Sequence, residues 1–520
     1  MNDLFVNPDV YLSDPPFDEW LKLIADNRQR LSPLESLRVA ARDEMNVAAQ
    51  RYSLRLQAAA AEVGIDLPVL EVAHEGGDAL VMTGHQPILF HCGIAHKYHL
   101  TDQFVALGSG AGIAVAIDTD EGDPTEWLIP CFDRTLASTW PTKAGRFSFA
   151  QSTDEGLPYG SVRLKSDTEI RATGQQIVDQ LQAGGLGDAA KRAEQATDWF
   201  ARLHHLPAVE AVLIVRRLFG LGTYVCDIPL SQLMTLRCSH QFFEKLIGDP
   251  IQFWSEYNRL LEQYRARHGI ENRVNPFPNL AQHADLYELP FWSIDVSTRR
   301  RSAVWCTVDD EGISLCDESG TPYGRQHNSN IADCLAGLPT DQMIVPRHAL
   351  ITALMRGLYC DLFVHGTGGG KYDQFTDELL QSRLSIEPPH LAVATASRYL
   401  LGSQRNELLR LEELAKNLRD MTYRPTQYFN TGAFTAETEQ QLQALSAARA
   451  DAVEQLKQLK SRGESARDVD HQIRDISNRS RELVERALEA ALQPLKQLGP
   501  DTRQAVLSRE YPWLLFGGAN

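Results

Sequence analysis

The sequence predicts an α/β protein with a Rossmann-like parallel sheet, inserted segments and a C-terminal α-helical coiled coil. Short apolar runs at residues 79–82 and 112–117 each end in a turn rich in Gly or Asp, and a helical pattern separates them. Apolar residues recur at spacings of three and four over much of residues 401–490. We expect a core over residues 1–390, with connecting segments inserted at about 135–345. A helical region with a docking tail is expected over 391–520.

Composition limits the classes of partner. The 520 residues have a net charge of −17, which disfavours non-specific binding to nucleic acid or to an anionic membrane. The eight cysteines include no CxxC pair, which fits a reducing cytosol better than a disulfide framework. There is no basic leader followed by an apolar stretch, and no apolar run approaches the ~20 residues of a membrane helix. We expect a cytoplasmic protein with a small-molecule substrate.

The first strand and the turn after it hold the first group of candidate site residues. Helices are expected over residues 15–62, a strand at 79–82, and a helix from about Cys92. At the carboxyl end of such a strand, polar groups and a helix N-terminus favour an anion. We expect His85, His91 and Lys97 to stabilise a phosphate or oxyanion. The alternative is a polar turn with satisfied histidines. Substrate or nucleotide contacts are expected from Thr83, Gly84, Gln86 and His96.

A second strand, at residues 112–117, ends in an acidic group. We expect Asp118, Asp120 or Asp123 to orient an amine or take its proton, and Glu121 to contact substrate. Carboxylate oxygens also suit Mg²⁺, and a plain acidic turn is the alternative. His96 and His99 share a helix face, but no carboxylate stands at a fixed spacing from them, so we predict no metal site.

Further strands and hairpins are expected before the next polar stretch. Residues 166–205 and 242–268 show helical patterns, and residues 223–228 are a candidate third strand. Alternation over residues 287–317 indicates hairpins.

A glycine-rich stretch follows the apolar run at residues 361–365. Four glycines in residues 366–370 can let backbone N–H groups line an anion site, and a helix is expected from about Thr376. The stretch is no Walker A loop, because Lys371 is followed by Tyr372, and a flexible loop is the alternative. This loop, the His85 turn and the acidic group should line one pocket, since parallel strands share one carboxyl edge. Further binding candidates are Arg347, His365, Gly366, Gly368, Gly369, Gly370, Lys371, Tyr372 and Asp373.

The last region shows heptad-like seams on both sides of Gly463. They predict an antiparallel helical hairpin or a coiled coil, and a homodimer through these helices. The apolar tail at residues 510–516 is expected to dock on the body. The seams comprise Leu442, Leu445, Ala452, Leu456 and Leu459, then Val469, Ile473, Ile476, Ser480, Leu483, Ala487 and Ala490.

The motifs resemble one family. Val81-Met-Thr-Gly-His-Gln-Pro87 is similar to the strand-TGQQ loop of the cysteine-adding enzymes of bacillithiol biosynthesis. Residues 118–123, Pro346-Arg347, His365-Gly366 and the Arg509-Glu-Tyr ending resemble later elements of that family. His85 stands where the family has Gln, and residues 91–93 and 368–373 also depart from its pattern, so the chain resembles a divergent member.

The resemblance implies a Rossmann-like core, a dimerising coiled coil, and the joining of cysteine to an amine-bearing acceptor. We therefore expect a ligase or transferase that adds an amino acid to a small molecule, with ATP or ADP and Mg²⁺ as candidate cofactors. Two alternatives stay open. One is a nucleotidyltransferase of the HIGH-type Rossmann class with another acceptor. The other is a non-catalytic binding or scaffold protein that dimerises through its helices.

Overall fold

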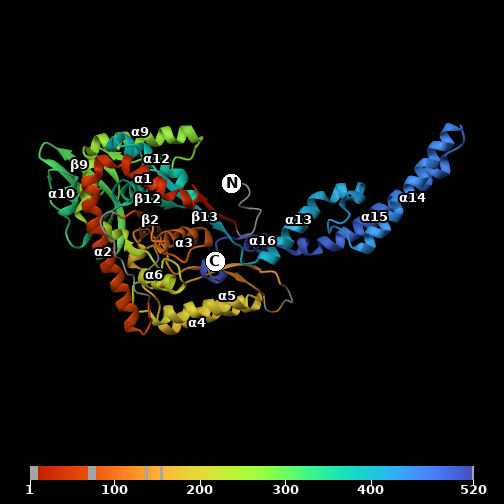
Figure 1. Ribbon diagram of the computed structural model, residues 1–520, viewed down its shortest axis with the longest axis horizontal. Helices are drawn as coiled ribbons and strands as arrows, with labels where there is room; N and C mark the ends of the chain where they lie inside the picture. Colours follow the sequence, from red (N-terminus) through yellow and green to blue (C-terminus); the bar gives the residue numbers. More distant parts are fainter. Residues whose placement is uncertain (1–9, 68–77, 134, 136–138, 153–155, 518–520) are drawn as a thin grey trace. The chain divides into compact units, whose positions relative to one another are not determined.

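The structure, a computed structural model, describes residues 10–67, 78–133, 135, 139–152 and 156–517. The chain divides into two compact units (Figure 1). Unit 1 comprises residues 1–129, 145–400 and 509–520, and unit 2 comprises residues 130–144 and 401–508. The division expected at residue 390 thus falls inside unit 1. The tail, which the sequence pattern places with the helical region, also belongs to unit 1.

Unit 1 is built around a six-stranded sheet. Its strands lie in the order β1–β13–β12–β2–β3–β6, and neighbours are parallel except for β1 with β13. Each of the four apolar runs expected to form strands does so, and the sheet gains β1 and β13, which the sequence analysis did not identify. The bounds are β1 Val10–Asp14, β2 Leu80–His85, β3 Ala111–Ala116, β6 Cys226–Pro229, β12 Leu362–His365 and β13 Leu391–Ser397.

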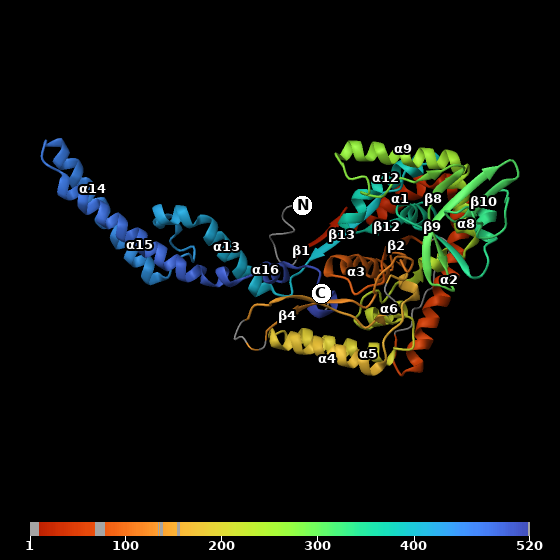
Figure 2. The ribbon, with the colours of Figure 1, turned by 180° about the vertical axis from the view of Figure 1, so that it is seen from behind.

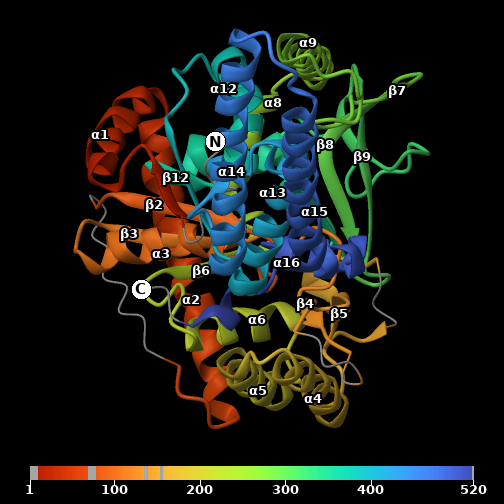
Figure 3. The ribbon, with the colours of Figure 1, turned by 90° about the vertical axis from the view of Figure 1, so that its right-hand side faces the viewer.

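The strand order reverses between β2 and β12. From β2 the chain proceeds outward to β3 and β6, whereas β12 and β13 are added on the other side of β2. Ligands of open α/β sheets bind at the carboxyl ends of strands at such a reversal. Helix α3 (Cys92–Ala106) follows β2 and α12 (Thr367–Leu384) follows β12, so both helices begin at this edge. Figure 3 shows β2, β3 and β12 side by side.

Both faces of the sheet are covered, which explains why its strands are continuous apolar runs rather than alternating ones. On one face Val81 belongs to a buried cluster with Trp20 and Phe104. Its neighbour Met82 belongs to a different, larger cluster that contains Phe243. The helices of unit 1 besides α3 and α12 are α1 Trp20–Arg30, α2 Glu35–Glu62, α4 Asp167–Ala183, α5 Gly187–Arg202, α6 Ala208–Leu218, α7 Leu230–Leu233, α8 Arg237–Ile247, α9 Pro250–His268, α10 Ile331–Ala336 and α11 Ala349–Leu354.

A second sheet in unit 1 is antiparallel. Its order is β10–β9–β8–β11, with β7 paired to β8, and the expected hairpins over residues 287–317 are confirmed (Figure 2). The bounds are β7 Gln282–His283, β8 Leu286–Asp295, β9 Arg300–Asp309, β10 Gly312–Cys316 and β11 Gln342–Pro346; β4 Trp127–Cys131 and β5 Lys143–Phe147 form a separate two-stranded sheet.

Unit 2 contains α13 (Gly402–Tyr423), α14 (Ala436–Ser461), α15 (Arg467–Gln497) and α16 (Pro500–Leu507). Helices α14 and α15 form the expected antiparallel hairpin, in which Arg449 Nε donates to Ser477 Oγ over 3.2 Å. Its apolar seam joins Ala452 to Val469 and Ile476, with Leu445, Leu456, Leu459 and Ile473 packed against them. These seam positions are therefore used within the chain itself.

The tail contacts the body of unit 1, as expected. The Trp513 backbone N–H donates to Phe90 O over 3.0 Å, and the side chains of Trp513, Leu514 and Leu515 are buried in the cluster that contains Phe90.

A buried carboxylate fastens the start of β12 to three other elements. Asp361 is 1% exposed and accepts hydrogen bonds from Arg28, Arg38 and Arg42 of α1 and α2. The Leu80 N–H at the start of β2 donates to the same carboxylate over 3.0 Å. Burial alone would raise the pKa of Asp361, but these guanidinium groups lower it below its ordinary value.

We predict that Asp361→Asn destabilises the protein by about 3–5 kcal/mol, because it leaves buried guanidinium groups without their counter-charge. Denaturant unfolding measures this free energy. The control is Glu454→Gln, which removes one partner of an exposed Lys457 pair in α14 and should barely move the midpoint. Equal effects of the two variants would show that the Asp361 network does not anchor β12.

Candidate functional site

A cavity of about 440 Å³ lies where the strand order reverses. We call it the central cavity. It is bounded by the carboxyl ends of β2 and β12 and by the starts of α3 and α12. The residues that line it are Gly84, His85, Gln86, His91, Gly93, Ile94, Lys97, Val115, Ile117, Asp120, His348, Ile351, Thr352, Met355, Phe363, His365, Gly366, Thr367, Gly368, Gly369 and Thr395.

Lys97 is the most unusual group in this cavity. Its side chain is buried, and Nζ donates to Gly84 O over 2.9 Å. Within the described ranges of the chain, no carboxylate lies within ion-pair distance of this ammonium group. Burial lowers the pKa of Lys97 from 10.5 to about 7. A buried cation without a counter-charge is costly, and an anion in the cavity would remove that cost.

The glycine stretch is helix rather than loop. Helix α12 begins at Thr367, so Gly368–Gly370 form its first turn and Gly366 is its N-cap; the expectation of a helix from about Thr376 is wrong. Glycine's poor helix propensity is outweighed by close packing. A Cβ on Gly369 would lie 2.1 Å from His365 Nδ1, and one on Gly370 would lie 2.8 Å from Val393 Cγ2.

The start of α12 faces the same space as Lys97. A Cβ on Gly366 would lie 4.0 Å from Lys97 Cδ. The first N–H groups of a helix lack intrahelical acceptors and carry the positive end of its dipole. Backbone donors and an ammonium group therefore converge on one side of the central cavity. In contrast, Lys371 and Tyr372 are exposed and do not line it.

Two expected histidines line the central cavity in the neutral form. His85 Nδ1 lies 3.1 Å from Gln86 O, and burial together with Lys97 lowers its pKa to about 3. His91 is the N-cap of α3, where its Nδ1 accepts from the Gly93 N–H over 3.0 Å. Burial also lowers the pKa of His91. Near pH 7 each can donate or accept one hydrogen bond without adding charge.

A buried chain of polar groups lies behind His365 at the cavity wall. His365 Nε2 lies 3.2 Å from Asp373 Oδ2, at ion-pair distance but without hydrogen-bond geometry. Arg356 Nη1 donates to the same oxygen over 2.9 Å, and Thr352 Oγ1 donates to Asp373 Oδ1 over 2.6 Å. Burial alone would raise the pKa of Asp373, but Arg356 and His365 lower it well below its usual range. Asp373 thus supports the site from behind rather than lining it.

The four acidic residues at 118–123 do not all line the same cavity. Only Asp120 lines the central cavity, where its carboxylate accepts from Gln86 Nε2 over 2.9 Å. Glu121 pairs with Arg301 over 2.8 Å, and Asp123 accepts from the N–H and hydroxyl of Thr125 over 2.7 Å. Asp118 lines a second cavity. The expectation that the whole group lines one pocket is wrong, because successive residues of this turn point in different directions.

Two other residues that were expected to bind a ligand, Arg347 and Thr83, instead make contacts within the protein. Arg347 is buried, pairs with Glu288, and lies over the Trp292 ring at 4.4 Å from its centroid. Thr83 is buried and donates to Val364 O over 3.0 Å, which ties β2 to β12.

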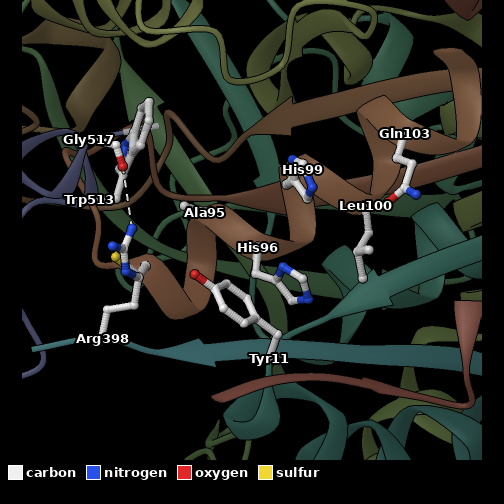
Figure 4. Close-up of a pocket in the computed structure, with 10 residues that line it drawn as sticks. Tyr11, Ala95, His96, His99, Leu100, Gln103, Arg398, Trp513 and Gly517 are labelled. Atoms are coloured by element: carbon white, nitrogen blue, oxygen red, sulfur yellow. Dashed lines mark hydrogen bonds between the residues drawn. The ribbon is translucent and has the colours of Figure 1, made fainter. Parts of the chain in front are cut away.

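His96 lies in a different cavity of about 200 Å³ (Figure 4). There its ring lies 5.3 Å from that of Tyr11 and 6.1 Å from that of His99, and burial lowers its pKa to about 4. Gly93 and Lys97 are four residues apart on α3 and share the face toward the central cavity. His96 is turned by about 100° from Lys97 and cannot share that face.

His348 is a cavity residue that the sequence analysis missed. It has a φ of 53°, a backbone conformation that non-glycine residues rarely adopt. Its ring stacks on Phe277 with centroids 4.9 Å apart, and burial, with Arg347 and Arg301 nearby, lowers its pKa to about 4. The preceding Pro346-Arg347 was the only local signal. Thr352, Met355, Phe363 and Thr395 are among the other lining residues that were likewise not identified.

Among the described residues, no group of three or more His, Cys, Asp or Glu side chains is placed to hold a metal ion. No helix in the described part of the chain combines the length and apolar character needed to cross a bilayer. Comparison of the sequence with protein-family models and with curated proteins finds no match.

The buried ammonium group gives a prediction for stability. Folding lowers the pKa of Lys97 from 10.5 to about 7. Below pH 7 the lysine is charged in both the native and the unfolded state, so the native state bears the whole free-energy cost of burying the charge. Between these two values the unfolded chain binds more protons than the native one, so stability rises with pH. Relative to Lys97→Met, the wild type should gain on the order of 5 kcal/mol from pH 7 to pH 10.5.

Urea unfolding at several pH values measures this difference, with Lys371→Met as the baseline for replacing an exposed lysine. A difference between wild type and Lys97→Met that stays constant with pH would contradict the assignment.

Proposed function

We propose that this protein is a ligase or transferase that binds an anionic group of a small-molecule substrate in the central cavity. The observation that supports the proposal most directly is Lys97, a buried ammonium group beside the start of α12 with no acidic partner among the described residues. A phosphate or carboxylate would accept hydrogen bonds from Lys97 and from the first turn of α12.

The strand order supports a Rossmann-like interpretation of the sheet. Three strands proceed outward on one side of the reversal and two parallel strands are added on the other, which is the doubly wound order. In that class the crevice at the reversal holds the phosphates of a nucleotide. ATP or ADP is therefore the proposed source of the anionic group, with Mg²⁺ as its counter-ion.

The family resemblance supplies the proposed reaction, the addition of an amino acid such as cysteine to an amine. In an ATP-driven form, a carboxylate oxygen of the amino acid first bonds to the γ-phosphorus of ATP, and ADP leaves. The acceptor nitrogen then bonds to the carboxyl carbon, phosphate leaves, and the nitrogen loses a proton. His365 is the proposed acceptor of that proton, because its ring lines the central cavity and its Nε2 lies 3.2 Å from the Asp373 carboxylate. Lys97 would stabilise the departing phosphate.

A second candidate is nucleotidyl transfer, which His85 and His91 favour. These two imidazoles flank the start of α3 at the end of β2, where HIGH-type enzymes place theirs. The products separate the candidates. Incubation with ATP, an amino acid and an amine should release ADP and phosphate in the favoured reaction, whereas the second should release pyrophosphate and leave AMP bonded to the acceptor. Binding without either turnover would indicate a non-catalytic binding protein.

The proposal includes a homodimer formed through unit 2. Because the α14–α15 seam is used within the chain, a dimer would need other surfaces of these helices. Light scattering should give about twice the chain mass of 58.1 kDa. A mass of one chain at micromolar concentration would contradict the dimer. A cytoplasmic location is likewise proposed, and fractionation of cells tests it.

We predict that Lys97→Met weakens the binding of inorganic pyrophosphate at pH 6.5 by about tenfold or more, because it removes a charged hydrogen-bond donor. Wild-type affinity should fall as the pH rises through about 7, since the protonated form binds the anion and Lys97 has a pKa of about 7. Titration calorimetry in buffers of different ionisation enthalpy should show proton uptake on binding above that pH.

The matched control is Lys371→Met, which removes an exposed lysine only four residues along α12 from Thr367. It should leave the affinity unchanged. Equal losses in the two variants would indicate a general charge effect. An unchanged affinity in Lys97→Met would contradict an anion site at Lys97.

A further inference from the structure

A second cavity, of about 320 Å³, lies at the carboxyl ends of β3 and β6. We call it the Asp118 cavity. Asp118 stands two residues after the end of β3, and Pro229 is the last residue of β6. Apolar side chains, among them Val209 and Met343, form part of the wall. The cavity therefore has an apolar body with polar groups at defined positions.

Asp118 is a buried carboxylate without a counter-charge. It is 8% exposed and accepts hydrogen bonds from the backbone N–H and the hydroxyl of Ser231. Within the described ranges, no Lys, Arg or His side chain lies within ion-pair distance of it. Burial raises the pKa of Asp118 above its ordinary value. The two Ser231 donors hold the carboxylate in place and leave its charge uncompensated.

Tyr52 provides a second, independent observation. It lines the same cavity with 4% of its surface exposed, and its hydroxyl has no hydrogen-bond partner in the part of the chain that the structure describes. Asp118 and Glu210 line the same cavity, and burial followed by the charges of nearby carboxylates raises the pKa of Tyr52. Arg55 pairs with Glu210 and lies over the Tyr52 ring, 5.0 Å from its centroid, so this cation, which also lines the cavity, is already engaged.

We infer that the Asp118 cavity binds the primary ammonium group of a small molecule. An ammonium group has three donors, and the acceptors among the described residues of this cavity include the Asp118 carboxylate, the Tyr52 hydroxyl oxygen and Gln232 Oε1, which is buried without a hydrogen-bond partner. It would also supply the charge that the buried carboxylate lacks. This inference deepens the proposed function, on which it rests for one point: the ammonium belongs to the amine-bearing acceptor.

The two cavities share a wall. Ile117 and Asp120 line the central cavity, whereas Asp118 between them lines the other. Adjacent Cα atoms are ~3.8 Å apart, so Asp118 and Asp120 are within ~8 Å of each other along the chain. The turn at residues 117–120 therefore contributes residues to both cavities.

Gly160 lines the Asp118 cavity next to the Asp118 carboxylate. A Cβ at this position would lie 3.2 Å from Asp118 Oδ2. The φ of Gly160 is not positive, so alanine is compatible with the backbone. Gly160→Ala therefore narrows the cavity next to Asp118 without removing its charge, and Asp118→Asn removes the charge while keeping the shape.

The experiment measures binding of n-butylamine and of its neutral counterpart n-butanol at pH 7 by saturation-transfer NMR titration. Wild type should bind butylammonium at least about tenfold more tightly than butanol, as expected for a hydrogen bond between charged groups. Asp118→Asn should abolish that preference, and Gly160→Ala should weaken butylammonium binding. Lys97→Met, in the other cavity, should leave it unchanged.

The outcomes separate this inference from the proposed function. Pyrophosphate binding that survives in Asp118→Asn while the amine preference disappears supports two distinct sites. Equal binding of amine and alcohol by wild type, or an amine preference that persists in both Asp118→Asn and Gly160→Ala, would overturn the ammonium site and leave the anion site standing. Failure of pyrophosphate binding alone would overturn the proposed function and leave the ammonium site standing.

Discussion

The parallel pairing of β2 with β12 is the constraint on which the rest of unit 1 depends. It joins segments about 280 residues apart in the sequence, with Val81 opposite Leu362 and Thr83 opposite Val364. Apolar residues alone would not fix its register. The buried Asp361 carboxylate does so, because it accepts from the Leu80 N–H and from three arginines of α1 and α2 at once.

The candidate site follows from that pairing. When β2 and β12 lie side by side, the helices that follow them must begin at the same edge, and their N-termini face one crevice. Lys97 of α3 then lies beside Gly366, at the start of α12, and is held by Gly84 O. The fold places a charge where water is largely excluded and supplies donors around it. We interpret this as preorganisation for an anionic ligand.

Much of the fold could be predicted because its signals are local. Continuous apolar runs indicated β2, β3 and β12, and regular spacing indicated the α14–α15 hairpin. Strand β13, Leu391–Ser397, was missed because its small residues follow two prolines and give no strong pattern. The glycines at 368–370 were expected to form a loop, because glycine has a low helix propensity. Helix propensity does not include tertiary contacts, and here the His365 ring and Val393 pack closely against Gly369 and Gly370.

The location of the candidate site could be predicted from the sequence, but many of the residues that line it could not. Sequence order and the geometry of parallel sheets brought His85, Lys97 and Gly366 to one edge, as expected. The direction of each side chain in a turn depends on tertiary contacts, so the separation of Asp118 from Asp120 had no local signal. His348 is held in the wall by its unusual backbone conformation and by Phe277, which lies 71 positions earlier in the chain.

The most direct test of the account is the ionisation of Lys97 itself. NMR of protein labelled with ¹³C at lysine Cε, assigned with Lys97→Met, follows this amine through a pH titration with and without saturating pyrophosphate. We expect a pKa near 7 for Lys97 in the free protein and a higher pKa when the anion is bound. An ordinary lysine pKa in the free protein, or one that pyrophosphate does not change, would contradict it.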